Sequence, residues 1–141
     1  MRILIVGCGR VGGLLAGRLV ENGNDVSIVD ANSRSFRRLP EKFPGRVVLG
    51  TGIDEDVLRT AGIEQANVFV AVTQDDNTNI MSAQIARNVF GIDHVILRIY
   101  DQARAAVYRQ LGLTVICPTT TVAGMIEEEV LRSTTAALRS S

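Results

Sequence analysis

Three glycines and one aspartate have the types and spacing of a phosphate- and ribose-binding site. Residues 1–6 read MRILIV, a run typical of a buried strand, and Gly7, Gly9 and Gly12 follow in the pattern GxGxxG. The first glycine permits a tight turn, the second lets the backbone approach a pyrophosphate, and the third lets the next helix pack closely. Asp30 ends the next apolar run, where a carboxylate accepts hydrogen bonds from a ribose diol. The pattern predicts a dinucleotide or adenine-nucleotide site; the alternative is a glycine-rich turn that binds nothing.

Strand and helix patterns alternate along the chain and would position these residues. Apolar runs predict six strands, at residues 1–6, 25–30, 46–50, 68–72, 94–99 and 114–117. Helix patterns lie between them, with capping acids such as Asp54 and terminal glycines such as Gly62. Continuous apolar strands are typical of a parallel sheet with helices on both faces. We therefore expect an α/β fold: a Rossmann-type, doubly wound, parallel six-stranded sheet in the order 3-2-1-4-5-6, with an extra C-terminal helix.

In an open α/β sheet the ligand lies at the carboxyl ends of the strands, and this rule selects the candidate site. The candidate cofactor-binding residues are Gly7, Cys8, Gly9, Arg10, Val11, Gly12, Asp30, Ala31, Asn32, Gly50, Thr51, Val72, Thr73, Asn79 and Arg98. Simpler interpretations stay open for several of them. Arg98 could form a salt bridge with a helix acid, Arg10 could lie on the surface, and Asn79 could cap a helix.

Composition excludes several classes of protein. The chain has 141 residues, a formal net charge of zero and 46% hydrophobic residues, which suits one globular domain without a nucleic-acid partner. No apolar run has membrane-spanning length and the first residues are no signal peptide, so we expect a cytoplasmic protein without direct membrane insertion. Cys8 and Cys117 form no CxxC pair and lack a clustered histidine, so we expect neither a metal site nor a disulfide framework.

Longer segments carry a family resemblance. The chain is similar to the N-terminal nucleotide-binding lobe of the RCK family, also called KTN or TrkA-N, over nearly its whole length. The segments that resemble the family are GCGRVG with Asp30, LGTGIDEDVLRTAGIEQANVFVAVTQDDNTN and VILRIYDQARAAVYRQLGLTVICPT. Two positions differ. The family's third strand usually ends in Gly-Asp, where this chain has Gly50 and Thr51, and its sixth strand ends near Pro-Glu, where this chain has Pro118 and Thr119.

The resemblance implies a function. Members of the family are cytosolic regulatory domains of potassium channels and of Trk and Ktr potassium-uptake systems. It implies binding of NAD(H) or ATP/ADP, assembly into homodimers or rings, and gating of a membrane pore subunit, with the protein peripheral at the inner face of the cell membrane. By position, the glycine turn with Arg10 and Val11 would hold phosphates, Asp30 the ribose, Gly50 and Thr51 the adenine side, and Arg98 would lie near the phosphates.

A small NAD-dependent oxidoreductase is the main alternative, because the same fold hosts dehydrogenases. A dehydrogenase needs a substrate pocket and an acid/base group beside the nicotinamide. The nucleotide fold takes up almost the whole chain, and the single histidine, His94, opens the fifth strand at the wrong end of the sheet. Tyr100 is followed four residues later by Arg104, so a Tyr-x-x-x-Lys motif is missing. We therefore predict no enzyme activity; a nucleotide-binding interaction module remains a third possibility.

The C-terminal residues predict a helix that contacts another copy of the chain instead of covering the sheet. We divide the chain into a Rossmann nucleotide-binding domain, residues 1–119, and a dimerisation or crossover helix with its tail, residues 120–141. Apolar residues recur at helical spacing beyond the sixth strand, where the core is already complete: Val122, Met125, Ile126, Val130, Leu131 and Leu138. This stripe predicts self-association through a helix at about residues 121–138, and the alternative is that it packs back on its own sheet.

Overall fold

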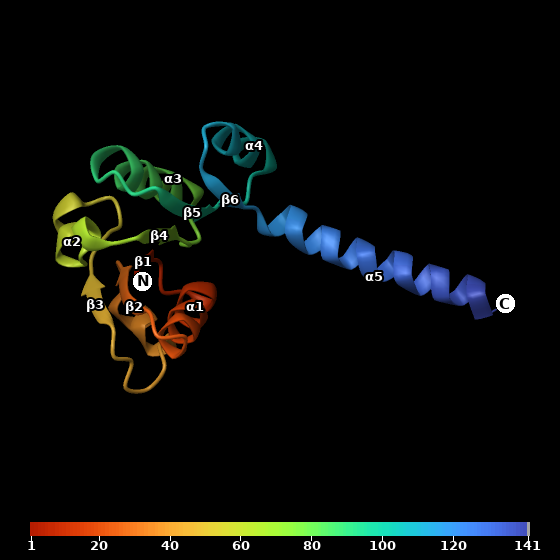
Figure 1. Cartoon of the computed structure of the whole chain (residues 1–141), viewed down its shortest axis with the longest axis horizontal. Coiled ribbons are helices and arrows are strands. Elements are labelled where there is room, and N and C mark those ends of the chain that lie inside the picture. Colours follow the sequence, from red (N-terminus) through yellow and green to blue (C-terminus); the bar gives the residue numbers. More distant parts are fainter. Residues whose placement is uncertain (141) are drawn as a thin grey trace.

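A computed structural model describes residues 1–140 and contains one six-stranded parallel sheet (Figure 1). The strands are β1 (Arg2–Val6), β2 (Asp25–Asp30), β3 (Arg46–Leu49), β4 (Val68–Ala71), β5 (His94–Arg98) and β6 (Thr114–Ile116). Their spatial order is β3-β2-β1-β4-β5-β6, and every neighbouring pair is parallel. The predicted Rossmann-type fold and strand order are confirmed, with strand ends that differ from the prediction by one residue.

Helical segments connect the strands. They are α1 (Arg10–Glu21), the 3-10 helix η1 (Ser33–Arg38), α2 (Glu55–Thr60), the 3-10 turn η2 (Ile63–Gln65), α3 (Asp76–Gln84), the π-helical segment η3 (Ile85–Val89), α4 (Gln102–Gln110) and α5 (Pro118–Ser140). Three helices begin after an aspartate whose carboxylate accepts backbone N–H groups of the first turn: Asp54, Asp75 and Asp101. These acids are N-caps, which is why the helices begin where the sequence indicates.

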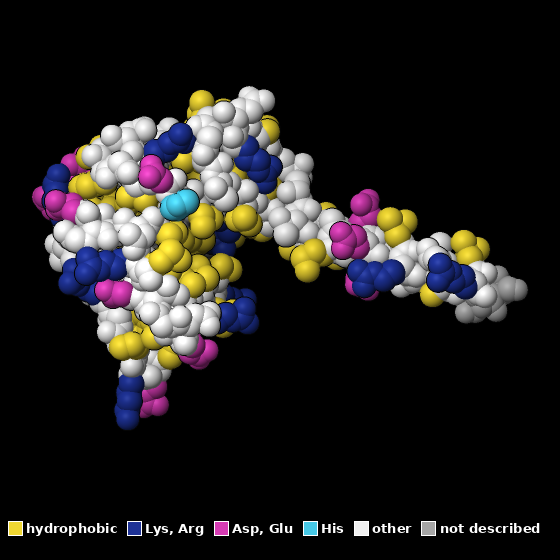
Figure 2. Space-filling view, viewed as in Figure 1, with side chains coloured by type: hydrophobic (Ala, Val, Ile, Leu, Met, Phe, Trp, Pro, Cys, Tyr) yellow, Lys and Arg dark blue, Asp and Glu magenta, His cyan; other side chains and the backbone are white. Residues whose placement is uncertain are grey.

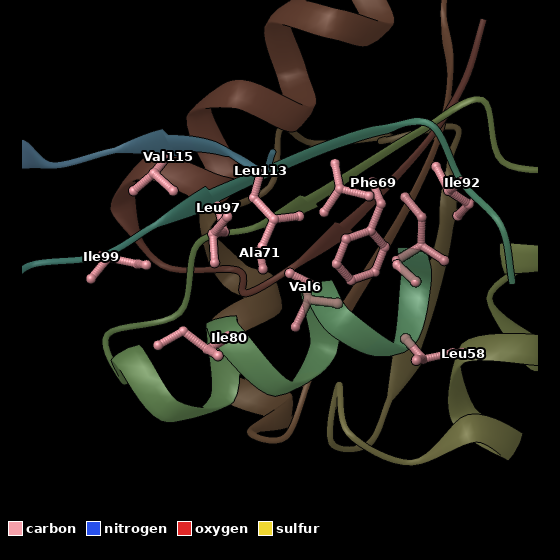
Figure 3. Close-up of a cluster of buried hydrophobic side chains, with 14 of the residues drawn as sticks. Val6, Leu58, Phe69, Ala71, Ile80, Ile92, Leu97, Ile99, Leu113 and Val115 are labelled. Atoms are coloured by element: carbon pink, nitrogen blue, oxygen red, sulfur yellow. The ribbon is translucent and has the colours of Figure 1, made fainter. Parts of the chain in front are cut away.

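Two hydrophobic layers enclose the sheet. On one face, α2, α3 and α4 cover side chains such as Val6, Phe69 and Leu97, and Figure 3 shows these pointing from the strands toward α3. On the other face, α1 and η1 cover β1 and β2 around Ile5 and Ile28. Because strand residues point alternately to the two faces, neighbours along β1 belong to different layers. The side chains of both layers are buried.

Helix α1 packs through small residues. The sequence predicts a buried apolar period through Val11 and Leu14, but these side chains are 49% and 56% exposed. The buried positions are instead glycines and an alanine: Gly12, Gly13, Ala16 and Gly17. A Cβ on Gly13 would lie 3.0 Å from the Cβ of Arg38, so α1 rests almost directly on the backbone of η1. The close approach required small residues, and that requirement outweighed the apolar pattern.

Helix α3 also differs from its predicted packing. The apolar spacing in residues 76–90 predicts the burial of five side chains: Ile80, Met81, Ile85, Ala86 and Val89. Ile80 and Ala86 are buried, but Met81 and Val89 are about half exposed. The π-helical turn of η3 adds a residue to the helical repeat near Val89. A prediction that counts 3.6 residues per turn therefore places Val89 on the wrong side of the helix.

Helix α5 projects away from the body as a single long rod (Figure 1). It begins at Pro118, earlier than the predicted residue 121, because proline suits the first position of a helix. Its apolar side chains, including Met125 and Val130, are more than half exposed, so the stripe does not pack back on its own sheet. Within residues 1–140, no helix is both long enough and apolar enough to cross a membrane.

Candidate functional site

The glycine turn lies at the carboxyl end of β1, between β2 and β4. Gly7 has φ +108°, and a Cβ there would lie 2.8 Å from the amide nitrogen of Thr73, so both the conformation and the space require glycine. A Cβ on Gly12 would collide with the carbonyl oxygen of Gly7. A Cβ on Gly9, by contrast, would meet nothing within 4 Å. Two of the glycines are therefore explained by packing, whereas Gly9 borders open space at the N-terminus of α1.

The first turn of α1 is available to an anion. Gly9 is the N-cap of this helix, and no side chain caps its N–H groups. Uncapped N–H groups and the positive end of the helix dipole favour a phosphate at this position. Arg10 and Val11 are exposed at the start of the same helix.

Asp30 joins the turn to the end of β2. Its Oδ2 accepts a hydrogen bond from the N–H of Cys8 at 2.8 Å, and its Oδ1 accepts one from the N–H of Asn32 at 2.8 Å. These two bonds hold the carboxylate in place while each oxygen keeps a further lone pair for a ligand hydroxyl. Ala31 is exposed beside it, and the Asn32 side chain caps η1 by accepting from the N–H of Arg34.

A cavity of about 410 Å³ lies next to Asp30 across the ends of β1, β2, β3 and β4. Its lining includes five residues selected from the sequence: Asp30, Ala31, Gly50, Thr51 and Thr73. The candidate set of cofactor-binding residues does not contain the other lining residues: Val6, Val29, Gly52, Gln74, Asp75 and Thr78. The signal for Gly52 in the sequence was its position two residues after Gly50, beyond a strand end. In the structure, a Cβ on Gly52 would collide with Val6.

Three side chains from the candidate set lie outside the cavity. Asn79 is fully buried; its amide donates to the carbonyl oxygens of Thr73 and Arg98, and its oxygen accepts from the Thr73 N–H and hydroxyl. All its hydrogen-bonding capacity is used inside the protein, so it positions Thr73. Val72 is 8% exposed and packs against the glycine turn, and the Cys8 thiol is buried and donates to the carbonyl oxygen of Ser35. The structure does not bring these three side chains into the cavity.

Arg98 is a buried cation without a carboxylate partner. It is 9% exposed, and one guanidinium nitrogen donates to the carbonyl oxygens of Val72 and Thr73 at 2.8 and 2.9 Å. Its guanidinium lies 5.0 Å from the centre of the Tyr100 ring, and its Nε is buried with no hydrogen-bond partner. The salt bridge considered as an alternative does not occur among the described ion pairs. A buried charge that lacks a counter-ion is costly, so an anion close to Arg98 would lower its free energy. Arg98 itself does not line the cavity beside Asp30.

Other features of the chain do not compete with this site. A larger cavity, of about 560 Å³, lies at the amino ends of β1 and β2 beside Arg2, Asp25 and Arg46, far from the glycine turn. Within residues 1–140, no group of three or more His, Cys, Asp or Glu side chains could hold a metal ion. Burial and the nearby Asp30 carboxylate raise the pKa of the Cys8 thiol to about 11, so this thiol stays neutral at physiological pH.

The glycine turn, the fixed carboxylate and the strand order together define a nucleotide-binding domain of the Rossmann class. The TrkA-N domain family matches residues 3–118, and this chain belongs to that family, which confirms the resemblance found in the sequence.

The relatives and solved structures agree with this assignment. The Trk system potassium uptake protein TrkA of Streptomyces coelicolor is 47% identical over 132 residues, which are 94% of this chain and 57% of that protein. TrkA of Vibrio alginolyticus is 43% identical over 99 residues, 70% of this chain and 22% of that protein. This chain thus spans from about a fifth to just over half of the length of these relatives.

The TrkA-N domain of the inner membrane protein ybaL from Escherichia coli has the same fold, with TM-score 0.79 and 23% identity over 90% of this chain and 94% of that one. The GsuK channel bound to NAD also matches, with TM-score 0.79 and 23% identity over 97% of this chain and 24% of that one.

Proposed function

We propose that this chain is a regulatory domain or subunit of a potassium transporter or channel, and that it binds NAD(H) or ATP/ADP to gate potassium transport by conformational change. The observation that carries the proposal is the bond between the Asp30 carboxylate and the glycine turn, which places a ribose acceptor beside a phosphate-binding helix end. The names of the curated TrkA relatives support the potassium-transport role. GsuK, a protein of the same fold, has been solved bound to NAD and bound to ADP.

The residues fit such a ligand in specific roles. The N–H groups at the start of α1 and the buried cation of Arg98 would bind the phosphates. Asp30 would accept hydrogen bonds from the ribose, and the adenine side would lie by Gly50 and Thr51. Asn79 would act by positioning Thr73. We propose residues 1–119 as the nucleotide-binding domain.

Assembly would turn nucleotide binding into gating. In Figure 1 the side of β5 and β6 that faces α1 has no helix over it, and Ile116 on β6 is 49% exposed there. We propose that α5 of a second copy covers such apolar surface, giving a homodimer in which each copy uses the same patch. A nucleotide then shifts the assembly only by binding one arrangement more tightly than another. Its partner would be a membrane pore subunit, which would hold the cytoplasmic protein at the inner face of the membrane.

Calorimetric titration of NAD, NADH, ATP and ADP into the purified chain tests nucleotide binding. Gly9→Val is the sharpest variant, because a side chain at Gly9 meets no protein atom but enters the space for the phosphates. We expect a folded Gly9→Val protein with no measurable nucleotide affinity, while Gly124→Val on α5, where a Cβ also meets nothing within 4 Å, binds like the unchanged protein. Equal affinity of the Gly9→Val protein would contradict the proposed site.

The oxidoreductase alternative has a separate test. We propose that the chain has no dehydrogenase activity, because His94 lies at the amino end of β5, away from the cavity, and no described histidine or lysine lines it. Steady NADH turnover with small carbonyl or hydroxy-acid substrates, abolished by Gly9→Val, would reverse this conclusion.

A further inference from the structure

The outer edge of β3 is an open strand edge. Figure 1 shows β3 at the end of the sheet, with no strand beyond it. The N–H of Gly50 donates to the carbonyl oxygen of Asp30, and backbone groups of successive strand residues point to opposite sides. The N–H and C=O groups of Val47 and Leu49 therefore point away from β2. Both side chains are also exposed, at 43% and 59%.

The segment beside this edge is strongly basic. The chain as a whole has equal numbers of basic and acidic residues, but residues 31–50 contain four arginines and a lysine against the single acid Glu41. Arg34, Arg37 and Arg38 of η1 are all exposed, and none of them takes part in a described ion pair. A cavity of about 410 Å³ lies among these three side chains.

Register places the basic segment and the apolar side chains on the same face of the sheet. Val47 pairs with Ile28, and Leu49 pairs with Asp30. Ile28 belongs to the layer that η1 and α1 cover. Because paired residues of neighbouring strands point to the same face, Val47 and Leu49 lie on that face too, on the edge strand next to β2. The surface therefore combines unpaired backbone groups, two aliphatic side chains and three guanidinium groups.

We propose that the β3 edge and the η1 arginines form a docking surface for an extended, acidic segment of a partner protein. The segment adds to the sheet as a seventh strand, hydrogen-bonded to Val47 and Leu49, and its carboxylates pair with Arg34, Arg37 and Arg38. On the face that carries the arginines, acidic and apolar side chains of the segment occur two positions apart, and the apolar ones rest on Val47 and Leu49. The cavity among the η1 arginines shares no lining residue with the cavity beside Asp30, and the proposal does not depend on the proposed function.

Charge and hydrogen-bonding geometry favour a peptide over other anionic partners. A nucleic acid or a lipid surface could satisfy the arginines, but neither supplies the row of N–H and C=O groups that a strand edge pairs with. The basic surface here is also confined to one short segment, whereas nucleic-acid tracking requires a larger basic face.

Fluorescence anisotropy with a labelled peptide of Glu-Thr-Val-Thr repeats (the Glu-Val peptide), in which Glu and Val share one face of a strand, tests the proposal on the full chain. We expect salt-sensitive binding that weakens about tenfold or more in Arg34→Glu/Arg37→Glu. Arg18→Glu/Arg139→Glu changes the net charge equally at two exposed arginines outside the segment, and should retain binding. A matched peptide of Lys-Thr-Val-Thr repeats should not bind.

A second measurement separates strand addition from charge attraction. In amide NMR spectra, the peptide should shift and protect the N–H groups of Val47 and Leu49. Val47→Pro removes an N–H that the sheet does not use, so it should fold and lose binding. The proposal is overturned if the Glu-Val peptide fails to bind, if shifts concentrate away from β3, or if anionic phosphatidylserine vesicles or duplex DNA bind through these arginines and the peptide does not.

Discussion

The glycine turn and α5 are opposite kinds of structure within one chain. At the turn, a side chain on Gly7 or Gly12 would overlap backbone atoms, so the packing admits no alternative residue. Along α5, Gly124 has open space around it, and apolar residues such as Met125 and Ile126 are 64% and 59% exposed. The turn is completed by its own chain, whereas the apolar stripe of α5 stays exposed. Substitutions should therefore change folding in the first region and association in the second.

The largest effect is expected at the turn. Gly12→Ala places a Cβ against the Gly7 carbonyl oxygen, and overpacking of this kind destabilises by about 3 kcal/mol or more. Gly124→Ala makes the same chemical change on the open helix and should stabilise it by about 0.5–1 kcal/mol. Urea unfolding of both variants measures the difference. Similar stabilities would remove the contrast between the two regions.

Loss of the ribose carboxylate ranks next. Asp30→Ala should weaken NAD binding by about 1–3 kcal/mol, because it removes a charge-assisted hydrogen bond. NAD should bind more tightly than NADP, since Asp30 repels a 2′-phosphate. Asp25→Ala is the matched control at the exposed amino end of the same strand, and calorimetry should show unchanged affinity there. Unchanged affinity in Asp30→Ala, or tighter binding of NADP, would refute the assignment of this carboxylate.

Substitutions in α5 should change the association of the chain and not its stability. If α5 forms a homodimer, Val130→Glu puts a charge into the apolar stripe and should weaken association about tenfold or more without changing the unfolding of the body. Glu128→Lys, which lies two residues from Val130 and so on nearly the opposite side of the helix, is the control. Light scattering on these variants and on a chain ending at Thr120 measures the effect. A monomeric intact chain at tens of micromolar, or a dimeric truncated chain, would exclude α5 from the assembly.

The smallest effect concerns the thiol within the turn. The folded-state pKa of Cys8 is raised to about 11, so the unfolded chain loses this proton first as the pH rises. The contribution of Cys8 to stability is therefore complete below its ordinary pKa and decreases as the pH approaches 11. Cys8→Ala should unfold with a weaker dependence on alkaline pH than the unchanged protein, measured by urea unfolding at each pH. An identical dependence would contradict the burial argument.

The sequence predicts the features that depend on local patterns. Strands, capping acids and the glycine turn follow from periodicity and residue type, and Asp30 lies where the ribose-binding pattern requires a carboxylate. The contacts that depend on three-dimensional proximity were harder to predict. The burial of Arg98 between two carbonyl oxygens and the Tyr100 ring has no signal in its neighbours along the chain. The same holds for Asn79, which resembles a helix cap in the sequence but is fully buried behind Thr73.

The positions of the apolar stripes on α1 and α5 were predictable from the sequence, but whether each stripe is buried was not. The period of α1 and the period of α5 look alike in the sequence, because both repeat apolar residues at helical spacing. The structure buries the small residues of α1 and exposes its Val11, while α5 leaves the body altogether. Hydrophobic periodicity specifies which residues share a side of a helix, and only the surrounding elements decide whether that side is buried.

The projection of α5 has a further consequence for the lifetime of the chain in a cell. Figure 2 shows yellow apolar side chains along α5, separated by charged ones, with the body of the protein at one end of the helix only. Apolar side chains that stay exposed on a folded protein are recognised by chaperones and proteases as a sign of incomplete assembly. We expect a copy without a partner to be degraded faster than an assembled copy, so that the amount of partner sets the amount of this protein that persists.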